Sequence, residues 1–302
     1  MSIMKLKSLI LMFISFLTAN VFAQRDFSDS DTTKLVILGS GTPAPSPFQS
    51  GCSLAIIVFD TSYIIDFGPG LVRKAAAMSP TYGGNIKGLE GKNTRYAFLT
   101  HLHPDHTIGY PDLLLTPWWA VGRDKPLEVY GPYGITQMTD YILKAYGQTN
   151  NQESLVNTHE FTEEGIIYQD KYVKVEAFPV LHIPNSWGFR FTTPDKVIVI
   201  SGDTAPSEKV VEYSKGADLL VHEVYTKKGF DIIWANDEAR QLWHKSNHTS
   251  AYELGEIASK INPKLLVLYH IIYWGASEQD LIDEISEKYK GRFIVGKDLD
   301  VF

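Results

Sequence analysis

The sequence has little of three features that would each indicate a different class of protein. Cys52 is the only cysteine among 302 residues, so the chain can form neither an internal disulfide nor a thiolate-rich zinc site. Beyond residue 23, no apolar run is long enough to span a bilayer. The formal net charge is −7, from 28 Lys and Arg against 35 Asp and Glu, and the basic residues form no cluster. Such a surface repels polyanions, which makes nucleic acid a disfavoured partner.

The N-terminal residues have the pattern of a secretory signal peptide. Two lysines precede a short apolar run from Leu9 to Leu17, and Val21 and Ala23 occupy the −3 and −1 positions of a cleavage site. The run is too short to span a bilayer comfortably, which argues against a membrane anchor. We therefore predict a signal peptide over 1–23 and a flexible polar lead-in over 24–33. The mature protein would be secreted or periplasmic, with no membrane span.

Residues 34–302 are predicted to form one α/β layered domain. Short apolar strands, such as Lys34–Leu38, alternate with helices, such as Leu71–Met78. This alternation is typical of layered α/β architectures. Polar residues repeatedly follow the predicted strands, among them His101, Asp203, His222 and His270. Active sites of such domains lie where the loops after the strands converge.

A dense group of potential metal ligands follows the strand Tyr96–Leu99. It reads His101-Leu-His103-Pro-Asp105-His106, with four ligand-type side chains in six residues. Imidazole and carboxylate suit zinc, manganese or iron. The motif can serve two ions, one bound by His101 and His103 and the other by Asp105 and His106.

One short motif cannot complete two metal sites, so further ligands must come from elsewhere in the chain. His182 and His270 follow predicted strands, and so does Asp203, whose neighbour Gly202 allows close approach of the backbone. A carboxylate has two oxygens, so Asp203 can bridge both ions. His159 lies in a polar stretch and is expected to be exposed, and the same is expected of His244.

This ordered set of residues resembles the ligand set of the metallo-β-lactamase superfamily, and it is most similar to the ribonuclease Z-like branch. The resemblance runs from about Leu35 to Phe302. It implies a four-layer αββα sandwich, a homodimer, and two divalent ions, most simply Zn²⁺, with Mn²⁺ or Fe²⁺ as alternatives. The implied ligands are His101, His103, Asp105, His106, His182, Asp203 and His270. Further similar segments are Gly39–Pro43, Tyr63–Gly68, Ser186–Arg190, Val221–Val224 and Asn247–Ser250.

Two departures from that branch concern the substrate. Ribonuclease Z carries a basic Pro-x-Lys-x-Arg-Asn loop near its start, whereas the corresponding segment 43–50 here has no Lys or Arg. Its long tRNA-gripping arm, rich in Gly and Pro, has no obvious counterpart within 131–172. The resemblance therefore supports the fold and the metal site more strongly than cleavage of tRNA.

The expected chemistry is hydrolysis by a hydroxide that bridges the two metals, since bound cations lower the pKa of water. Asp105 would bind metal and orient this nucleophile. The resemblance implies that His248 donates a proton to the leaving group, with Glu223 orienting it and keeping it cationic. The alternative for Glu223 and His248 is a structural ion pair. His222 is either a support for a ligand or structural.

Asp66 and the tryptophans leave alternatives open. Asp66 is either a carboxylate that supports a metal ligand or a turn cap before Gly68. Several tryptophans lie near ligands in sequence and either line an apolar substrate pocket or pack in the core. These are Trp118, Trp119, Trp187 and Trp274.

Together these features predict an exported dinuclear metal-dependent hydrolase that acts on a small phosphodiester or related ester. Because fold does not determine substrate, a lactonase, an arylsulfatase and a β-lactamase-like hydrolase remain alternatives. A ribonuclease Z-type endoribonuclease ranks below them. A metal-binding scaffold without turnover is the non-enzymatic alternative, and the complete ligand set argues against it.

Overall fold

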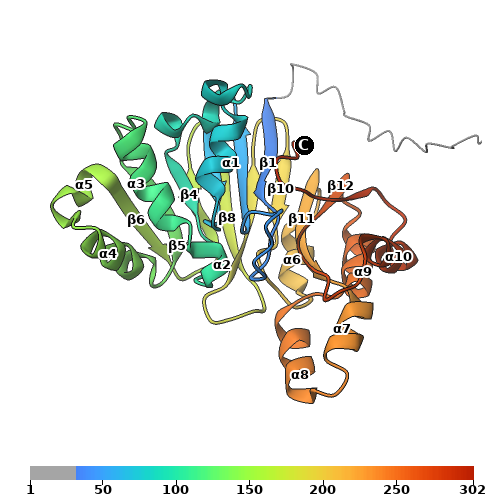
Figure 1. Ribbon diagram of the computed structural model, residues 1–302. Helices are drawn as coiled ribbons and strands as arrows, with labels where there is room; N and C mark the ends of the chain where they lie inside the picture. Colours follow the sequence, from blue (N-terminus) through green and yellow to red (C-terminus); the bar gives the residue numbers. More distant parts are fainter. Residues whose placement is uncertain (1–31) are drawn as a thin grey trace, which may run out of the picture. The chain divides into compact units, whose positions relative to one another are not determined.

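Two mixed β-sheets lie face to face in residues 32–302, the part of the chain that the computed structural model describes (Figure 1). The predicted signal peptide, 1–23, and residues 24–31 of the predicted lead-in lie outside the described residues. The first strand begins at Thr33, one residue before the expected start of the domain. Thr33 is buried, and its hydroxyl lies 2.8 Å from that of Thr193.

The first sheet has six strands in chain order, antiparallel at its beginning and parallel from the third strand onward. Its strands are β1 (Thr33–Gly39), β2 (Ser53–Val58), β3 (Thr61–Ile65), β4 (Tyr96–Phe98), β5 (Leu127–Pro132) and β6 (Val156–Phe161). The parallel strands carry candidate site residues on the loops that follow them, as expected for such sheets.

The second sheet has seven strands and repeats this change from antiparallel to parallel pairing. Its strands are β7 (Gly165–Gln169), β8 (Lys174–Pro179), β9 (Trp187–Thr192), β10 (Val197–Ile200), β11 (Leu219–Tyr225), β12 (Leu265–Ile272) and β13 (Phe293–Val295). The sequence did not lead us to expect β6, β7 or β13.

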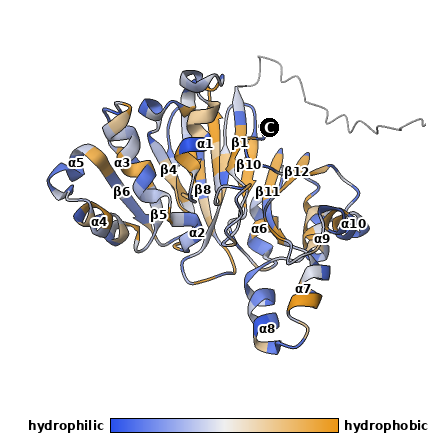
Figure 2. Ribbon diagram, viewed as in Figure 1, coloured by the Kyte–Doolittle hydropathy of each residue, from blue (hydrophilic) through white to orange (hydrophobic). Residues whose placement is uncertain are grey.

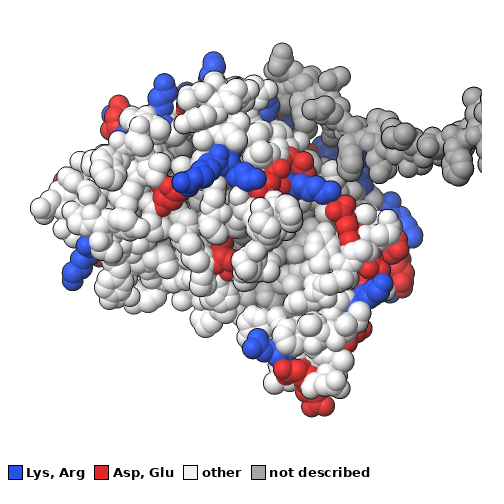
Figure 3. All heavy atoms as spheres, in the orientation of Figure 1, with Lys and Arg blue, Asp and Glu red and all other residues white. Residues whose placement is uncertain are grey.

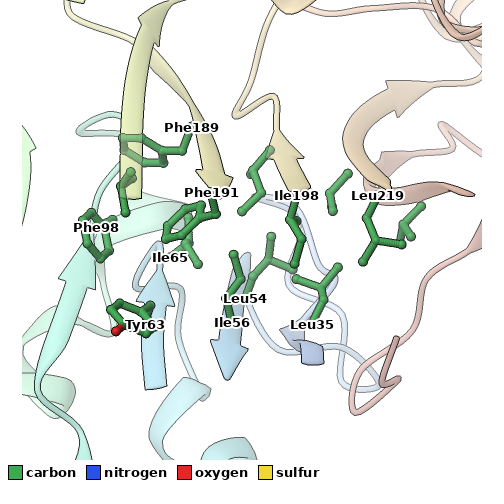
Figure 4. Close-up of a cluster of buried hydrophobic side chains, with 14 of the residues drawn as sticks. Leu35, Leu54, Ile56, Tyr63, Ile65, Phe98, Phe189, Phe191, Ile198 and Leu219 are labelled. Carbon is green, nitrogen blue, oxygen red and sulfur yellow. The ribbon is translucent and has the colours of Figure 1, made fainter. Parts of the chain in front are cut away.

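The main core lies between the two sheets. Leu35 of β1, Leu54 of β2 and Phe98 of β4 meet Phe189 and Phe191 of β9 there, and all five are essentially buried (Figure 4). Alternate residues of β1, β2 and β4 point outward and are also buried, beneath helices. This burial of both faces explains why the strands read as continuous apolar runs rather than as alternating patterns.

Helices cover the outer face of each sheet, so that the expected αββα order of four layers is confirmed (Figure 1). The strands are the most apolar part of the described chain, and the helices are mixed, with hydrophilic residues among apolar ones (Figure 2). Over the first sheet pack α1 (Leu71–Met78), α3 (Tyr110–Ala120), α4 (Ile135–Ala145) and α5 (Gln152–Leu155). Over the second pack α6 (Glu208–Tyr213), α9 (Ala251–Ile261) and α10 (Glu278–Lys288).

Two further helices, α7 (Lys227–Ile233) and α8 (Glu238–Asn247), form a hairpin between β11 and α9 and extend away from the sheets (Figure 1). Neither was expected from the sequence. Asp237 caps α8 by accepting a hydrogen bond from Arg240 N. Among the described residues, no helix has the length and apolar character needed to cross a membrane.

Candidate metal centre

Two groups of His and Asp side chains meet beside the ends of the sheets, and each group can hold a metal ion. We call His101, His103, His182 and Asp203 the outer cluster, and Asp105, His106, Asp203 and His270 the inner cluster. Within each cluster the potential ligand atoms all lie within 4.8 Å of one another. All the side chains predicted as ligands are therefore brought together, and Asp203 belongs to both clusters.

The first sheet supplies the histidine motif. His101 lies just beyond β4, and the short helix α2 (Pro104–Thr107) begins directly after His103. Pro104 occupies the first helical position, where its missing N–H costs nothing. This turn of helix places Asp105 beside His106, whose Nε2 atom lies 3.4 Å from Asp105 Oδ2.

The second sheet supplies Asp203 from the loop after β10. Gly202 adopts a φ of +62°, and a Cβ atom there would lie 2.7 Å from the carbonyl oxygen of Trp187. Only glycine fits this close passage of the backbone. The loop thereby brings Asp203 between the histidines, with Oδ1 at 3.5 Å from His106 Nε2 and Oδ2 at 3.9 Å from His101 Nε2.

His270 reaches the site from within a strand rather than from its end. We expected the strand to stop before His270, but β12 continues to Ile272 and bulges at this point. Tyr269 pairs with Glu223 and Ile271 with Val224, which leaves His270 as the extra residue, with a φ of +44°. Such a conformation is strained for a residue with a side chain, and strain of this kind gathers at functional sites.

The unsatisfied polar atoms of the two clusters fit a bound cation. Among the buried side-chain atoms of the described residues that have no hydrogen-bond partner, four belong to the two clusters: His101 Nε2, His106 Nε2, His270 Nδ1 and Asp203 Oδ1. Buried polar atoms are ordinarily paired, because loss of hydration is costly. Zn–N bonds of about 2.0–2.1 Å place two ligands of one tetrahedral ion roughly 3.3 Å apart, close to the 3.0 Å between His103 Nδ1 and His182 Nε2.

The protonation of the outer cluster also suits a metal. Burial lowers the pKa of His101 and lowers that of His182 to about 4. Burial alone would raise the pKa of Asp203, but the histidines around it, His270 first, keep that pKa well below its usual value. Neutral imidazole and ionised carboxylate are the forms that bind divalent cations. In the inner cluster, burial lowers the pKa of His106 and of His270, but acidic neighbours such as Asp203 outweigh it and raise both, so a cation that binds there would displace protons.

Asp66 supports the ligands from behind, which decides between its two predicted roles. Its Oδ2 atom lies 2.8 Å from His106 Nδ1, and its Oδ1 atom accepts hydrogen bonds from the backbone and the hydroxyl of Thr100. The Thr100 hydroxyl in turn lies 3.0 Å from His101 Nδ1. One buried carboxylate thus orients a histidine in each cluster, directly in one case and through Thr100 in the other.

Cys52 lies behind the inner cluster and forms a third compact group with Asp66 and His106. The thiol is buried, and burial raises its pKa to about 12. Only the thiolate binds metal well, so Cys52 is part of the packed support of the site.

Glu223 and His248 form a buried pair next to the outer cluster. Glu223 Oε1 lies 3.1 Å from His248 Nδ1 and accepts hydrogen bonds from the backbone of Thr204 and Thr249. The His248 ring centroid is 5.0 Å from that of His182. Burial lowers the pKa of His248 to about 4 and raises that of Glu223, so burial opposes the cationic form of His248 that we expected Glu223 to stabilise.

The remaining histidines lie outside the two clusters. His222 lies within β11 rather than after it, and its Nδ1 atom lies 2.7 Å from the backbone oxygen of Glu223, so its role is structural. His159 is exposed, as predicted, and stacks on Tyr130. His244 was expected to be exposed as well, which is wrong: it is 8% exposed and packs on the rings of Trp234, Trp243 and Trp274.

The tryptophans singled out in the sequence do not contact the clusters. Trp187 is buried against Phe161, Trp119 is almost fully exposed, and Trp274 packs on His244. The tryptophan at the site is Trp243 of α8, whose ring lies 6.4 Å from that of His182 and 5.7 Å from that of His248. Trp243 lies far from His182 in the sequence, so the sequence did not indicate this contact. Trp243 does come five residues before His248, which was a candidate site residue.

A sandwich of this kind, with His and Asp side chains collected from loops of both sheets, defines the metallo-β-lactamase fold. Residues 61–271 match the Beta-lactamase superfamily domain. The chain therefore belongs to the metallo-β-lactamase superfamily of hydrolases.

Individual relatives cover nearly all of the chain. Ribonuclease Z of Mycobacterium marinum is 29% identical over 282 residues, which cover 88% of this chain and 96% of the relative. The metallo-β-lactamase fold protein YhfI from Bacillus subtilis has a TM-score of 0.70 at 18% identity, covering 90% of this chain and 100% of its own. The short form of human tRNase Z has a TM-score of 0.64 at 23% identity, covering 89% and 98%. These two structures support the fold alone.

Proposed function

We propose that this protein is an exported, dinuclear metal-dependent phosphodiesterase that acts on a small substrate. The observation that carries the proposal is the pair of clusters that share Asp203, with buried nitrogen atoms that have no other partner among the described residues. The outer cluster would hold one divalent ion and the inner cluster the other, most simply Zn²⁺, with Mn²⁺ or Fe²⁺ as alternatives.

The protein supplies position and charge around those ions. When bound, two divalent ions would provide Lewis-acid stabilisation of the attacked group and activate water near neutral pH. Asp105 reaches between His106 and His270, with its Oδ2 atom 3.1 Å from His270 Nε2, and can orient the attacking water. Asp203 would bring the two cations close together, because each of its oxygens faces different histidines.

His248 is the proposed proton donor to the leaving group. Its Nδ1 atom is held by Glu223, so the opposite edge of the ring, carrying Nε2, is the edge free to face a substrate. As Nε2 releases a proton to the leaving oxygen, Nδ1 can take up one held by the Glu223 carboxyl group. Proton transfer of this kind contributes about 10²–10⁴-fold to a rate, and most when the leaving group is a poor one.

Several features favour a small substrate over a folded RNA. Segment 43–50 has no Lys or Arg. On the face shown in Figure 3, Lys and Arg atoms lie among Asp and Glu and form no continuous basic surface. Residues 131–172 fold into α4, α5, β6 and β7, and α4 packs on the first sheet through Ile135 and Leu143. Most residues of this segment therefore belong to helices and strands of the domain, and few remain that could form a tRNA-gripping arm.

The test is a comparison of four ester classes on one metal-reconstituted preparation. A phosphodiester, a sulfate ester, a lactone and a β-lactam would be offered together, with bound metal measured on the same sample. We expect two ions per chain and the highest kcat/KM with the phosphodiester. A preference for the lactone or the sulfate ester would replace the proposed substrate class, and no turnover with two bound ions would leave a metal-binding scaffold.

Ribonuclease Z activity is the second candidate, because relatives such as the Mycobacterium marinum protein carry that name. Precursor tRNA would be added to the same assay at low and moderate salt. We expect cleavage that is weak even at low salt, since neither segment 43–50 nor the face shown in Figure 3 offers a continuous basic surface to bind the RNA backbone. Efficient, site-specific cleavage at moderate salt would favour the ribonuclease over the small-substrate enzyme.

Export rests on the N-terminal sequence and needs its own test. Expression of the full chain in a Gram-negative host should yield a periplasmic or secreted form whose first residue is Gln24. Replacement of Leu9–Leu17 by a polar segment should retain the protein in the cytoplasm. An uncleaved wild-type chain in the cytoplasm would contradict export without touching the enzymatic proposal.

A further inference from the structure

Trp243 lies on α8 at the margin of the outer cluster with much of its indole ring in water. The ring lies within 6.4 Å of His182 and 5.7 Å of His248 between centroids, and the side chain is 43% exposed. Its neighbour Leu242 is 69% exposed. A large aromatic ring exposed next to a candidate active site is a common sign of a binding surface.

The position of Trp243 is fixed by contacts on both sides of α8. The carbonyl oxygen of Asn247 lies 2.9 Å from His182 Nδ1, and the Asn247 side chain donates a hydrogen bond to the carbonyl oxygen of Trp243. The indole ring meets His244 edge-on at 4.9 Å, and His244 is itself enclosed by Trp234 and Trp274. Trp243 is therefore a pre-positioned surface, with little conformational freedom to lose when a ligand binds.

We propose that Trp243 forms a subsite for the leaving group of the substrate, and that this leaving group is an alcohol that carries a planar aromatic ring. The inference rests on the proposed function. Hydrolysis breaks the P–O bond to the leaving alcohol while a water oxygen forms the new P–O bond. The leaving oxygen takes its proton from His248, so the ring beside His248 faces the group that departs.

The combination of a proton donor and an aromatic surface limits the chemistry of that group. A phenol leaves without much help, whereas an alkyl alcohol needs a proton as the P–O bond breaks. A planar ring gains more from stacking on indole than a saturated ring of similar size. Stacking of a nucleobase on an aromatic side chain is worth about 5- to 150-fold in affinity. A nucleoside hydroxyl has both properties.

The experiment uses three symmetric phosphodiesters, so that either bond releases the same alcohol: dibenzyl, bis(cyclohexylmethyl) and dimethyl phosphate. Their alcohols have similar basicity and differ in planarity and apolar area. For the metal-loaded wild-type protein we expect kcat/KM to fall in that order, with dibenzyl phosphate at least about tenfold better than dimethyl phosphate. Binding of dibenzyl phosphate to the metal-free protein, measured by calorimetry, gives a readout independent of turnover.

Variants at this position separate stacking from general damage. Trp243→Ala should raise KM for dibenzyl phosphate about tenfold or more, leave dimethyl phosphate within about twofold, and weaken binding to the metal-free protein. Trp243→Phe should retain most of the preference, and Trp243→Leu should lose the advantage of benzyl over cyclohexylmethyl. Trp119→Ala is the matched control, because Trp119 is 84% exposed on α3 and makes none of these contacts.

The outcomes distinguish this inference from the proposed function. No hydrolysis of any diester by the metal-loaded wild type would refute the function itself. Hydrolysis without a benzyl preference, or equal losses on all three diesters in Trp243→Ala, would refute the subsite while the function stands. Equal rates for benzyl and cyclohexylmethyl esters would refute the aromatic specificity.

Discussion

The outer and inner clusters contain similar side chains but are supported differently. His106 and His270 of the inner cluster are fully buried, and His106 is held by the Asp66 carboxylate. In the outer cluster His103 is partly exposed, and His182 is held by the neutral carbonyl of Asn247. A carboxylate behind a histidine fixes its ring and raises its basicity. We infer that the inner cluster binds its ion more tightly and that the outer cluster, nearer to His248 and Trp243, faces the substrate.

Substitution of Asp203, which belongs to both clusters, should have the largest effect on activity, because it changes both clusters at once. Asp203→Ala is expected to lower kcat/KM by at least about 10⁴-fold, because both ions lose a ligand. Metal content should fall together with activity. Asp112→Ala is the control, because its carboxylate contacts Arg73 and Thr116 and belongs to neither cluster. A variant that kept both ions and near-normal activity would show that Asp203 is not shared.

The proposed proton donor, His248, tests the comparison because its ring lies next to that of His182 in the outer cluster. His248→Ala should slow a diester with an alkyl leaving group by about 10²–10⁴-fold. The loss for bis(p-nitrophenyl) phosphate should be less than about tenfold, since nitrophenolate leaves without a proton. His159→Ala, at an exposed position on β6, serves as the control. Equal losses on both substrates would remove His248 as the acid.

The supports of the two clusters can be tested separately. Asp66→Asn should weaken the tighter of the two metal affinities by about 10- to 100-fold, because His106 loses its anionic partner. Thr100→Val removes the hydroxyl next to His101 and should change affinity by less than about tenfold. Titration of the metal-free variants with zinc gives both constants. If Asp66→Asn weakened only the looser site, the assignment of inner and outer affinity would be reversed.

The rates at which a chelator removes the two ions should show the smallest difference between the clusters. A chelator added to the loaded protein should remove one ion about tenfold faster than the other, the faster phase coming from the outer cluster. His103→Ala should eliminate the fast phase and leave the slow one. Absorbance of the chelator–metal complex with time measures both phases. A single phase in the wild-type protein would mean that the clusters lose their ions together.

The side chains of the two clusters could be predicted from the sequence, because most of them lie in one short motif or follow a recognisable strand. Four of them lie in one short motif, and Asp203 lies in the loop just after the apolar strand β10. His270 belongs to the inner cluster, as predicted, but we expected the strand to end before it. Instead His270 lies at a bulge within β12, and that bulge depends on the pairing between β11 and β12. Register between strands far apart in the sequence cannot be deduced from either strand alone.

The α7–α8 hairpin shows where such reasoning fails. Residues 226–247 lack the regular apolar spacing of a core helix, because α8 packs mainly through aromatic rings near its end. We expected His244 to be exposed, yet its ring packs on those of Trp234 and Trp274. One of these tryptophans precedes His244 in the sequence and the other follows it. The burial of His244, like the role of Trp243, depends on tertiary contacts that have no local signature in the sequence.

The shared centre has a consequence for how the protein folds. Asp105 comes from the first sheet and His270 from the second, 165 positions later, yet their side chains lie 3.1 Å apart. No stretch of chain from one sheet alone can assemble either cluster, because each draws ligands from both. Bound ions would act as removable cross-links that close a very long loop, so loading should raise the barrier to separating the sheets. A chain whose single cysteine excludes an internal disulfide would then be held in its folded form by bound metal.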